Sequence, residues 1–298
     1  MRIRIAARPS RLSLIQVDIL VRELEEKLGS IDYEIVKVKS HGDINKTAPF
    51  EALGVTGVFE KKVNQAVLAG KADIAVHSMK DLPSNIDTRL TISYVTRRGD
   101  PRDAIVSREE EPVYFHELPE GSVIGTSSAR RRSLVLHYNP GLRVEGIRGN
   151  IETRLGKLGK GYDFIIVSAA ALDRMDADYP HLRLPLEYFP PAPGQGFIAV
   201  TSLKNSKISS VLMELVDRDS YTVAMAERAL LSSFGGGCST PLGGYCGFRG
   251  GIGFCRGVLL SRDGSRMSIL EHVAGKTDLV EAGVKVGSAL RELNQGER

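Results

Sequence analysis

Apolar residues follow two periods along the first third of the chain, one typical of strands and the other of helices. Residues 12–28 repeat apolar side chains at helical spacing, with Ser10 as a candidate N-cap and Gly29 placed to end the helix. The run 72–77 is almost continuously apolar, which is typical of a strand buried in a parallel sheet. The same pattern predicts strands at 3–6, 33–38 and 90–96 and a helix at 59–69.

The alternation of predicted strands and helices is interrupted by a polar segment, Arg97 to Asp103, and resumes after it. A second boundary follows at residues 190–196, which are rich in proline and glycine. We expect the strand at 197–200 and the helix at 208–216 to return to the first unit, so that two α/β lobes are joined by a pair of linkers. Between the boundaries the pattern predicts strands at 104–106, 123–125, 143–145 and 164–168 and helices at 128–138 and 151–158.

After Arg218 the pattern no longer alternates between strands and helices, and short β segments are predicted instead. Asp263-Gly264 is a hairpin-turn signal between two of these segments. The expected elements are helices at 220–234 and 279–293 and strands near 244–247, 254–260 and 266–273. The predicted division is an α/β lobe 1 made of residues 1–96 and 197–217, an α/β lobe 2 of residues 103–190, and a small α+β domain of residues 218–298.

Composition narrows the class of protein. The chain has 298 residues, 42% of them hydrophobic and 26% charged, with a net charge of +4. No apolar run reaches the ~18 residues of a membrane span, and the first residues do not resemble a secretion signal, so we expect a cytoplasmic protein. The mild positive charge is smaller than that of a typical dedicated nucleic-acid binder and fits small anionic ligands equally well. The three cysteines are an odd number without a C-x-x-C pair, and we expect neither a disulfide framework nor a zinc site.

A glycine-rich loop from Gly235 to Gly244 carries one thiol, that of Cys238. Three glycines before the cysteine let the backbone approach another group closely, and Thr240-Pro241 prevents the preceding helix from continuing. We interpret the loop as an attachment point that holds a sulfur in a cleft. A surface loop with an incidental cysteine remains open, because thiol reactivity depends on environment.

Polar residues gather where predicted strands end, the place at which open α/β sheets bind ligands. Thr126, Ser127 and Ser128 stand at a predicted helix start, where free N–H groups favour an anion, and Arg130 and Arg131 follow directly. The alternative is a capped helix with a solvated basic face. Arginines in the first turn oppose the helix dipole, so we favour an anion site.

Three further strand ends have similar chemistry. Arg148 and Arg154 flank a Gly-Asn turn, although the alternative of a cap with an exposed arginine remains. Lys80 and Asp81 follow the buried strand at 72–77, where a carboxylate can stabilise a developing cation or exchange protons. A simple turn with an exposed lysine competes with that interpretation. Arg8 and Ser10 form a weaker instance, and His77 is interpreted as a histidine satisfied by structural hydrogen bonds.

Together these stretches resemble the hydroxymethylbilane synthases, also called porphobilinogen deaminases. The similarity runs in order over essentially the whole chain. Its most specific parts are His77-Ser78-Met79-Lys80-Asp81 and Gly236-Gly237-Cys238. It is further carried by residues 8–16, 72–83, 125–131, 148–150 and 193–196.

The resemblance implies two lobes like those of type II periplasmic binding proteins and a small α+β C-terminal domain. It implies a transferase that adds four porphobilinogen molecules head to tail, with loss of ammonia at each addition through an azafulvene, and releases hydroxymethylbilane. The primer is a dipyrromethane cofactor, itself made from two porphobilinogen units. We therefore expect a monomer that acts on a small molecule in tetrapyrrole and heme biosynthesis, without a metal, nucleic acid or membrane partner.

The resemblance also assigns roles by position. It makes Cys238 the covalent anchor of the cofactor, through a thioether, and Asp81 the catalytic carboxylate near the pyrrole nitrogens. The expected cofactor-binding residues are Ser78, Lys80, Asp81, Thr126, Ser128, Arg130, Arg131 and Arg148. The expected substrate-binding residues are Arg8, Ser10, Phe59, Ser127, Arg148, Arg154, Arg174 and Gln195.

One departure from the family pattern concerns the loop at 40–56. The family often has a Gly-Lys-Gly-Leu-Phe run, whereas this chain has Val55-Thr56-Gly57-Val58-Phe59. Thr56 cannot supply the positive charge of that lysine, so the loop is not expected to act as a charged lid in the same way.

Two other classes of function compete with the enzyme. A two-lobed anion-binding protein without chemistry explains the linkers and the arginines, but not the cysteine loop. A nucleic-acid binder lacks support, because the sequence has no aromatic platform and no basic run.

Overall fold

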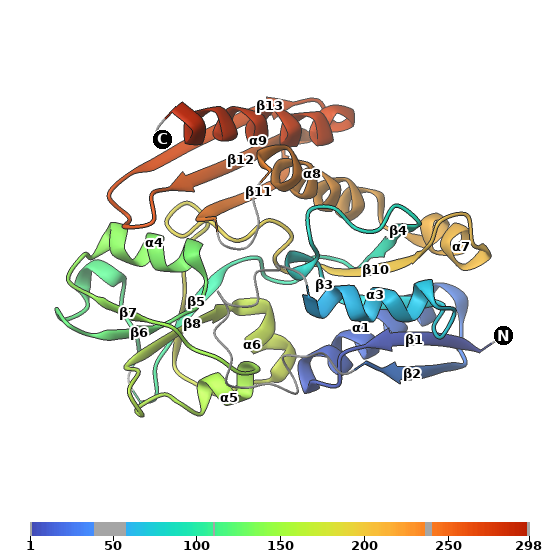
Figure 1. The fold of residues 1–298 in the computed structure, drawn as a ribbon, viewed down its shortest axis with the longest axis horizontal. Coiled ribbons are helices and arrows are strands. Elements are labelled where there is room, and N and C mark those ends of the chain that lie inside the picture. The colour runs from blue at the N-terminus through green and yellow to red at the C-terminus, as the bar shows by residue number, and fades with distance from the viewer. Residues whose placement is uncertain (1, 39–57, 110, 236–239, 297–298) are drawn as a thin grey trace. The chain divides into compact units, whose positions relative to one another are not determined.

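The structure, a computed structural model, describes residues 2–38, 58–109, 111–235 and 240–296, with the side chains of 58–61 and 296 left out. The chain divides into two compact units (Figure 1). Unit 1 comprises Met1–Gly99 and Phe197–Tyr221, and unit 2 comprises Asp100–Gly196 and Thr222–Arg298. No helix in the described ranges is both long and apolar enough to cross a membrane.

Unit 1 is built on a five-stranded sheet in the order β2-β1-β3-β10-β4. Strand β10 runs antiparallel to both of its neighbours, whereas β1 pairs in parallel with β2 and β3. The strands are β1 (Ile3–Ala7), β2 (Tyr33–Lys37), β3 (Ile74–Ser78), β4 (Leu90–Val95) and β10 (Ile198–Leu203), and the helices are α1 (Arg11–Leu28), α3 (Val58–Leu68), η2 (Met79–Asp81) and α7 (Lys207–Leu215).

Alternation along the strands explains why both faces of this sheet are covered. Ile5 and Ile74 pack in a core with residues of α1 and α7, whereas the intervening Ala6 and Ala75 pack with residues of α3. Small residues on the second face let α3 approach the strands closely. The sheet is therefore the middle layer of three, as an α/β lobe requires.

Unit 2 contains a second five-stranded sheet, with the order β7-β6-β8-β5-β9. Strand β5 is antiparallel to both neighbours, as β10 is in unit 1. The two sheets share one topology, and the expected pair of α/β lobes is confirmed. The elements are β5 (Asp103–Val106), η3 (Phe115–Glu117), β6 (Val123–Gly125), α4 (Ala129–Tyr138), β7 (Arg143–Glu145), α5 (Ile151–Leu155), β8 (Phe164–Ser168), α6 (Ala169–Met175) and β9 (His181–Arg183).

The C-terminal part of unit 2 is a three-stranded antiparallel sheet, β11-β12-β13, with helices packed on it (Figure 1). Val258 and Leu260 of this sheet belong to the same hydrophobic core as Ile105 and Leu134 of the second α/β sheet. This shared core explains why the two parts form one unit. The elements are α8 (Arg218–Phe234), β11 (Leu242–Arg249), β12 (Ile252–Leu260), β13 (Met267–Ala274), η4 (Lys276–Asp278) and α9 (Leu279–Gly296).

Most predicted elements are confirmed to within a few residues. One predicted helix needs correction, and the sequence does not predict two of the observed elements. The helix predicted at 151–158 ends at Leu155, with Gly156 as its C-cap. Helix α6 and strand β9 were not predicted. At seven and three residues, both are shorter than the windows in which helical or strand periodicity is recognised.

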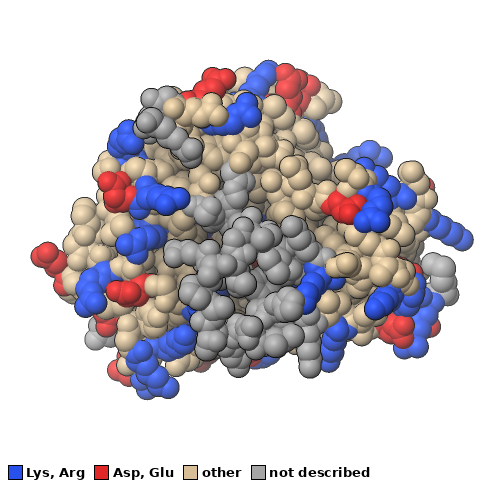
Figure 2. All heavy atoms as spheres, in the orientation of Figure 1, with Lys and Arg blue, Asp and Glu red and all other residues tan. Residues whose placement is uncertain are grey.

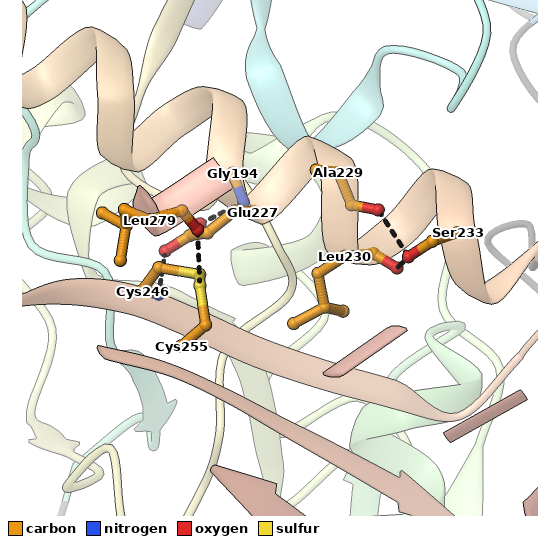
Figure 3. The surroundings of a disulfide bond; sticks show 8 residues. All are labelled: Gly194, Glu227, Ala229, Leu230, Ser233, Cys246, Cys255 and Leu279. Atoms are coloured by element: carbon orange, nitrogen blue, oxygen red, sulfur yellow. Dashed lines mark hydrogen bonds between the residues drawn. A yellow bond between two sulfur atoms is a disulfide. The ribbon is translucent and has the colours of Figure 1, made fainter. Parts of the chain in front are cut away.

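The expectation that the cysteines form no disulfide is wrong for two of them. Cys246 and Cys255 are bonded through their sulfurs, with Cα atoms 4.1 Å apart (Figure 3). They lie directly opposite each other on β11 and β12. The turn between these strands, Gly250-Gly251, has positive φ at both residues, as a two-residue hairpin turn requires. Recognising that turn in the sequence fixes the register and brings the two cysteines together.

Candidate functional site

In unit 1 the predicted residues meet where β3 ends. Arg8, Ser10, Ser78 and Asp81 line one pocket of about 80 Å³, the room of roughly two or three water molecules. Ser10 caps α1, accepting a hydrogen bond from the Ser13 amide at 3.4 Å. Asp81 is exposed and Lys80 is half-buried, both in the single turn η2 that follows β3. A carboxylate here is therefore available to a ligand.

Gln16 was missed as a member of this group. It lies on α1, is buried, and its Nε2 donates a hydrogen bond to Ser78 Oγ at 2.7 Å. The bond fixes the end of β3 against α1 at the pocket wall. A polar residue between Leu14 and Val17, on the helix face that carries the apolar positions, is the signal in the sequence.

His77 is buried one residue before the end of β3. Its Nε2 donates to Asn64 Oδ1 at 2.9 Å, and Thr201 Oγ1 donates to the same oxygen at 2.6 Å. Burial lowers the pKa of His77 to about 3, so the imidazole is neutral at pH 7. The interpretation of His77 as a satisfied structural histidine is confirmed by these bonds.

We expect His77 to make the stability of unit 1 depend on pH. Its folded-state pKa of about 3 lies below the ordinary 6.5, so the unfolded chain binds a proton that the folded chain excludes. The contribution is fully present above pH 6.5 and is lost as the pH falls from 6.5 towards 3. Between pH 7 and pH 5 the free energy of unfolding should drop by about 2 kcal/mol more than in His77→Gln.

Urea unfolding of both proteins at the two pH values, followed by circular dichroism, measures this difference. The carboxylates of the chain titrate in both proteins, so they cancel in the comparison. An equal drop in the wild type and in His77→Gln would show that His77 is protonated in the folded state.

In unit 2 two strand-end loops are joined by hydrogen bonds. Ser128 caps α4 and accepts from the Arg131 amide at 3.4 Å, while Thr126 Oγ1 accepts from the Ser128 amide at 3.2 Å. Ser127 Oγ donates to the Ile147 carbonyl at 2.7 Å and accepts from the Ile147 amide at 3.0 Å. Ser127 thus connects the loop after β6 to the loop after β7.

The loop after β7 presents arginines on the surface. Arg148 is exposed, and Arg154 is half-buried with its Nε donating to the Gly149 carbonyl at 2.8 Å. Asn150 caps α5 and accepts from the Thr153 amide and hydroxyl. Because Ser127 holds Ile147, the position of Arg148 depends on the neighbouring loop.

Arg130 and Arg131 share one carboxylate, that of Asp103, and we call these three residues the Asp103 cluster. Arg130 Nη2 and Arg131 Nη2 each lie 2.6 Å from a different Asp103 oxygen. Their remaining Nη1 groups donate to the Pro190 and Ile166 carbonyls. Burial lowers the pKa of Arg130, and Asp103 opposes that effect. A guanidinium stays protonated in proteins, so the cluster holds two positive charges and one negative.

The boundary at 190–196 contacts this cluster through Gln195. Its Nε2 donates to Asp103 Oδ1 at 2.9 Å and to the Pro101 carbonyl at 2.8 Å. Arg174 Nη2 donates to the Gly196 carbonyl at 2.6 Å. The loop is also held by Glu227 of α8, which is buried and accepts from the Gly194 amide at 2.6 Å and the Cys246 amide at 2.9 Å (Figure 3).

The remaining predicted positions are outside the described residues. Cys238 and the loop at 40–56 are among them, as is the side chain of Phe59. A wider hollow of about 500 Å³ in unit 1 is lined by residues that include Lys27 and Arg97 but none of the predicted site residues. Figure 2 shows basic and acidic side chains interspersed on the face viewed, without a dominant basic patch among the residues described there.

Comparison with known protein families matches nearly all of the chain. Residues 3–210 match the model described as "Porphobilinogen deaminase, dipyromethane cofactor binding domain". Residues 221–292 match "Porphobilinogen deaminase, C-terminal domain".

Similar proteins occur in several archaea. A "Probable porphobilinogen deaminase" of Aeropyrum pernix is 44% identical over 99% of this chain and 97% of its own length. One of Ignicoccus hospitalis is 43% identical, also over 99% of this chain and 97% of its own length. Among solved structures, an ancestral cationic amino acid solute binding protein aligns with 72% of this chain and 87% of its own, at 12% identity and a TM-score of 0.42.

Proposed function

We propose that this chain, which belongs to the porphobilinogen deaminase family, carries its cofactor on Cys238 and uses Asp81 as its catalytic carboxylate. The activity is that of a hydroxymethylbilane synthase, a transferase of porphyrin and heme biosynthesis that condenses four porphobilinogen molecules head to tail. Each condensation forms a carbon–carbon bond between pyrrole units and releases one ammonia. The family match over both parts of the chain is the observation that carries this function.

The cofactor of this family is dipyrromethane, and the Asp103 cluster fits such an anionic group. Pyrrole units of this pathway carry acetate and propionate side chains. The cluster has an excess of one positive charge, and the buried Nε atoms of Arg130 and Arg131 have no hydrogen-bond partner among the described residues. Each guanidinium has five N–H donors, so both retain capacity for carboxylate oxygens. When bound, the dipyrromethane supplies the pyrrole carbon to which the first porphobilinogen is joined.

Asp81 has the exposure that a catalytic group needs. Loss of ammonia from the aminomethyl carbon leaves a cation conjugated with the pyrrole ring, and a carboxylate nearby stabilises that charge. Asp81 lines the pocket that also contains Arg8 and Ser10. We propose that Arg8 and Ser10 bind substrate carboxylates there while Asp81 faces the pyrrole nitrogen.

The chain itself tethers Cys238 to the unit that contains the Asp103 cluster. Strand β11 begins at Leu242, four residues after Cys238. A Cβ built on Gly243 would lie 3.3 Å from Arg130 Cδ and 3.0 Å from the Pro190 carbonyl oxygen, and the Gly244 amide donates to the Pro191 carbonyl at 2.8 Å. This contact supports a cofactor anchored at Cys238 and bound by the arginines of the same unit.

The other predicted residues are proposed in the same roles. Ser78, Lys80, Thr126 and Ser128 serve the cofactor, and Ser127, Arg154, Arg174, Gln195 and Phe59 serve the substrate, with Arg148 serving both. We further propose a cytoplasmic monomer without a nucleic-acid or membrane partner, divided into the three domains predicted from the sequence.

Intact-mass spectrometry tests the proposal directly. We expect the purified chain to be heavier than its sequence by a dipyrromethane, and Cys238→Ser to have the mass of the bare chain. The double variant Cys246→Ser/Cys255→Ser is the control, since it removes the other two cysteines together with their disulfide and should retain the adduct. An adduct that persists in Cys238→Ser would overturn the assignment of the anchor.

A further inference from the structure

The position of Asp103 is unusual for a carboxylate. It is the first residue of β5, a strand that lies between β8 and β9 and is buried at all four of its residues. Its side chain is 0% exposed, and the exposed fractions of Arg130 and Arg131 are only 3% and 7%. A buried charge is costly unless it is paired with good geometry. Asp103 therefore needs its two arginines to remain ionised inside the fold.

The two arginines in turn depend on Asp103. Arg130 and Arg131 stand in the first turn of α4, where the helix dipole disfavours cations. Asp103 supplies the negative charge that this turn lacks, and binds one guanidinium with each of its oxygens. Gln195 donates to Asp103 Oδ1 and so restricts the carboxylate to this orientation. The orientation of both guanidinium groups is thus set by one side chain.

The charge that remains is what gives the cluster a function. One carboxylate neutralises one of the two guanidinium groups, so one positive charge stays in a region from which water is excluded. In such a region a fixed charge attracts an anion more strongly than it does in water. An anionic ligand that reaches the cluster would balance this charge.

We propose that Asp103 is a positioning residue for cofactor binding, which orients Arg130 and Arg131 and leaves their cluster with one positive charge for a cofactor carboxylate. This proposal rests on the function proposed above, in which those arginines bind the dipyrromethane. Asp103 itself does not touch the ligand.

A purely structural role for Asp103 is the alternative, and the chain offers a matched control for it. Asp100 also serves two guanidinium groups, those of Arg102 at 2.7 Å and Arg183 at 2.9 Å. Burial disfavours its ionised form, but hydrogen bonds from these arginines outweigh that effect and lower the pKa of Asp100 to about 2. Asp100→Asn therefore breaks a comparable pair of guanidinium contacts in the same unit, with arginines other than Arg130 and Arg131.

The experiment compares Asp103→Asn with Asp100→Asn. Asparagine has the shape of aspartate but turns an N–H₂ group towards one guanidinium, which releases that arginine. We expect both variants to melt at lower temperatures than the wild type. Cofactor occupancy, read from intact masses, should fall at least tenfold in Asp103→Asn and stay at the wild-type level in Asp100→Asn.

If Asp103→Asn does not fold, Asp103→Glu tests the positioning role of Asp103 in its place. It keeps the charge balance but displaces the carboxylate by one methylene, so occupancy should fall while the charge is retained. Wild-type occupancy in a folded Asp103→Asn or Asp103→Glu overturns the proposal. Equal loss in Asp100→Asn and Asp103→Asn also overturns it, because occupancy then follows stability alone.

A second pair of variants separates this proposal from the function on which it rests. Arg131→Leu removes the surplus charge and should lower occupancy, whereas Arg132→Leu alters an exposed arginine outside the cluster and should not. Loss in Arg131→Leu with full occupancy in Asp103→Asn refutes only the role of Asp103. Full occupancy in Arg131→Leu refutes the proposed role of the arginines as well.

Discussion

Replacing Asp81 with alanine should lower the rate of porphobilinogen addition by at least a hundredfold to a thousandfold while the fold stays intact. In the role proposed for Asp81, the group that would be lost is a single preorganised charge next to the carbon that loses ammonia. Removing one such group typically costs about 2.7–4 kcal/mol of transition-state stabilisation. Asp81 is exposed, and substitutions at exposed positions usually change stability by about 0.5 kcal/mol or less. The expected result is an inactive protein with a normal melting temperature.

Single-turnover measurements on cofactor-loaded protein give this rate without interference from product release. Each addition raises the intact mass by one pyrrole unit, so the first step can be followed alone. Asp87→Ala is the control, because it removes another exposed carboxylate of unit 1, one that binds Arg89. A normal rate of first addition in Asp81→Ala would remove Asp81 from the mechanism.

Replacing Gly283 with alanine should destabilise the C-terminal part of unit 2 by about 3 kcal/mol, at the upper end of the usual cost of overpacking. A Cβ on Gly283 would overlap the carbonyl oxygen of Ala226 on α8, and a Cβ on Gly287 would overlap that of Leu230. These two glycines lie one turn apart on α9, so they allow the backbones of the two helices to approach closely. A backbone oxygen cannot rotate away as a side chain can, and α9 must therefore shift.

Thermal unfolding of Gly283→Ala and Val284→Ala tests this prediction. Val284 is the next residue on α9 and is 41% exposed, so its truncation should have little effect. Cofactor occupancy of Gly283→Ala is a useful second measurement, since α8 ends at Phe234, four residues before Cys238. A melting temperature equal to that of Val284→Ala would show that the helices can separate at no cost.

Most helices and strands could be predicted from their hydrophobic pattern, whereas α6 and β9 could not. Helix α1 has its caps at Ser10 and Gly29, and the sequence predicts both. Helix α6 begins with three alanines directly after β8, so nothing in its pattern separates it from the strand. Strand β9 has three residues and depends on pairing with β5.

The residues of the candidate site also fall into those that could be predicted from the sequence and those that could not. Residues that form motifs along the chain, such as Ser78 to Asp81 and Thr126 to Arg131, could be recognised locally. Asp103 could not, because its partners are 27 and 28 residues away and its own neighbours suggested only a linker. Gln16 and Glu227 were missed for a similar reason, since each acts on an element distant in sequence.

The disulfide of the C-terminal sheet has a mechanical consequence for the cysteine loop. Strand β11 starts just after that loop, and Cys246 joins it covalently to β12. A force applied to the chain at Thr240 therefore cannot separate β11 from β12 beyond the disulfide at Cys246. If the growing polymer is attached at Cys238, as proposed, tension on it would reach a hairpin whose two strands cannot separate beyond Cys246.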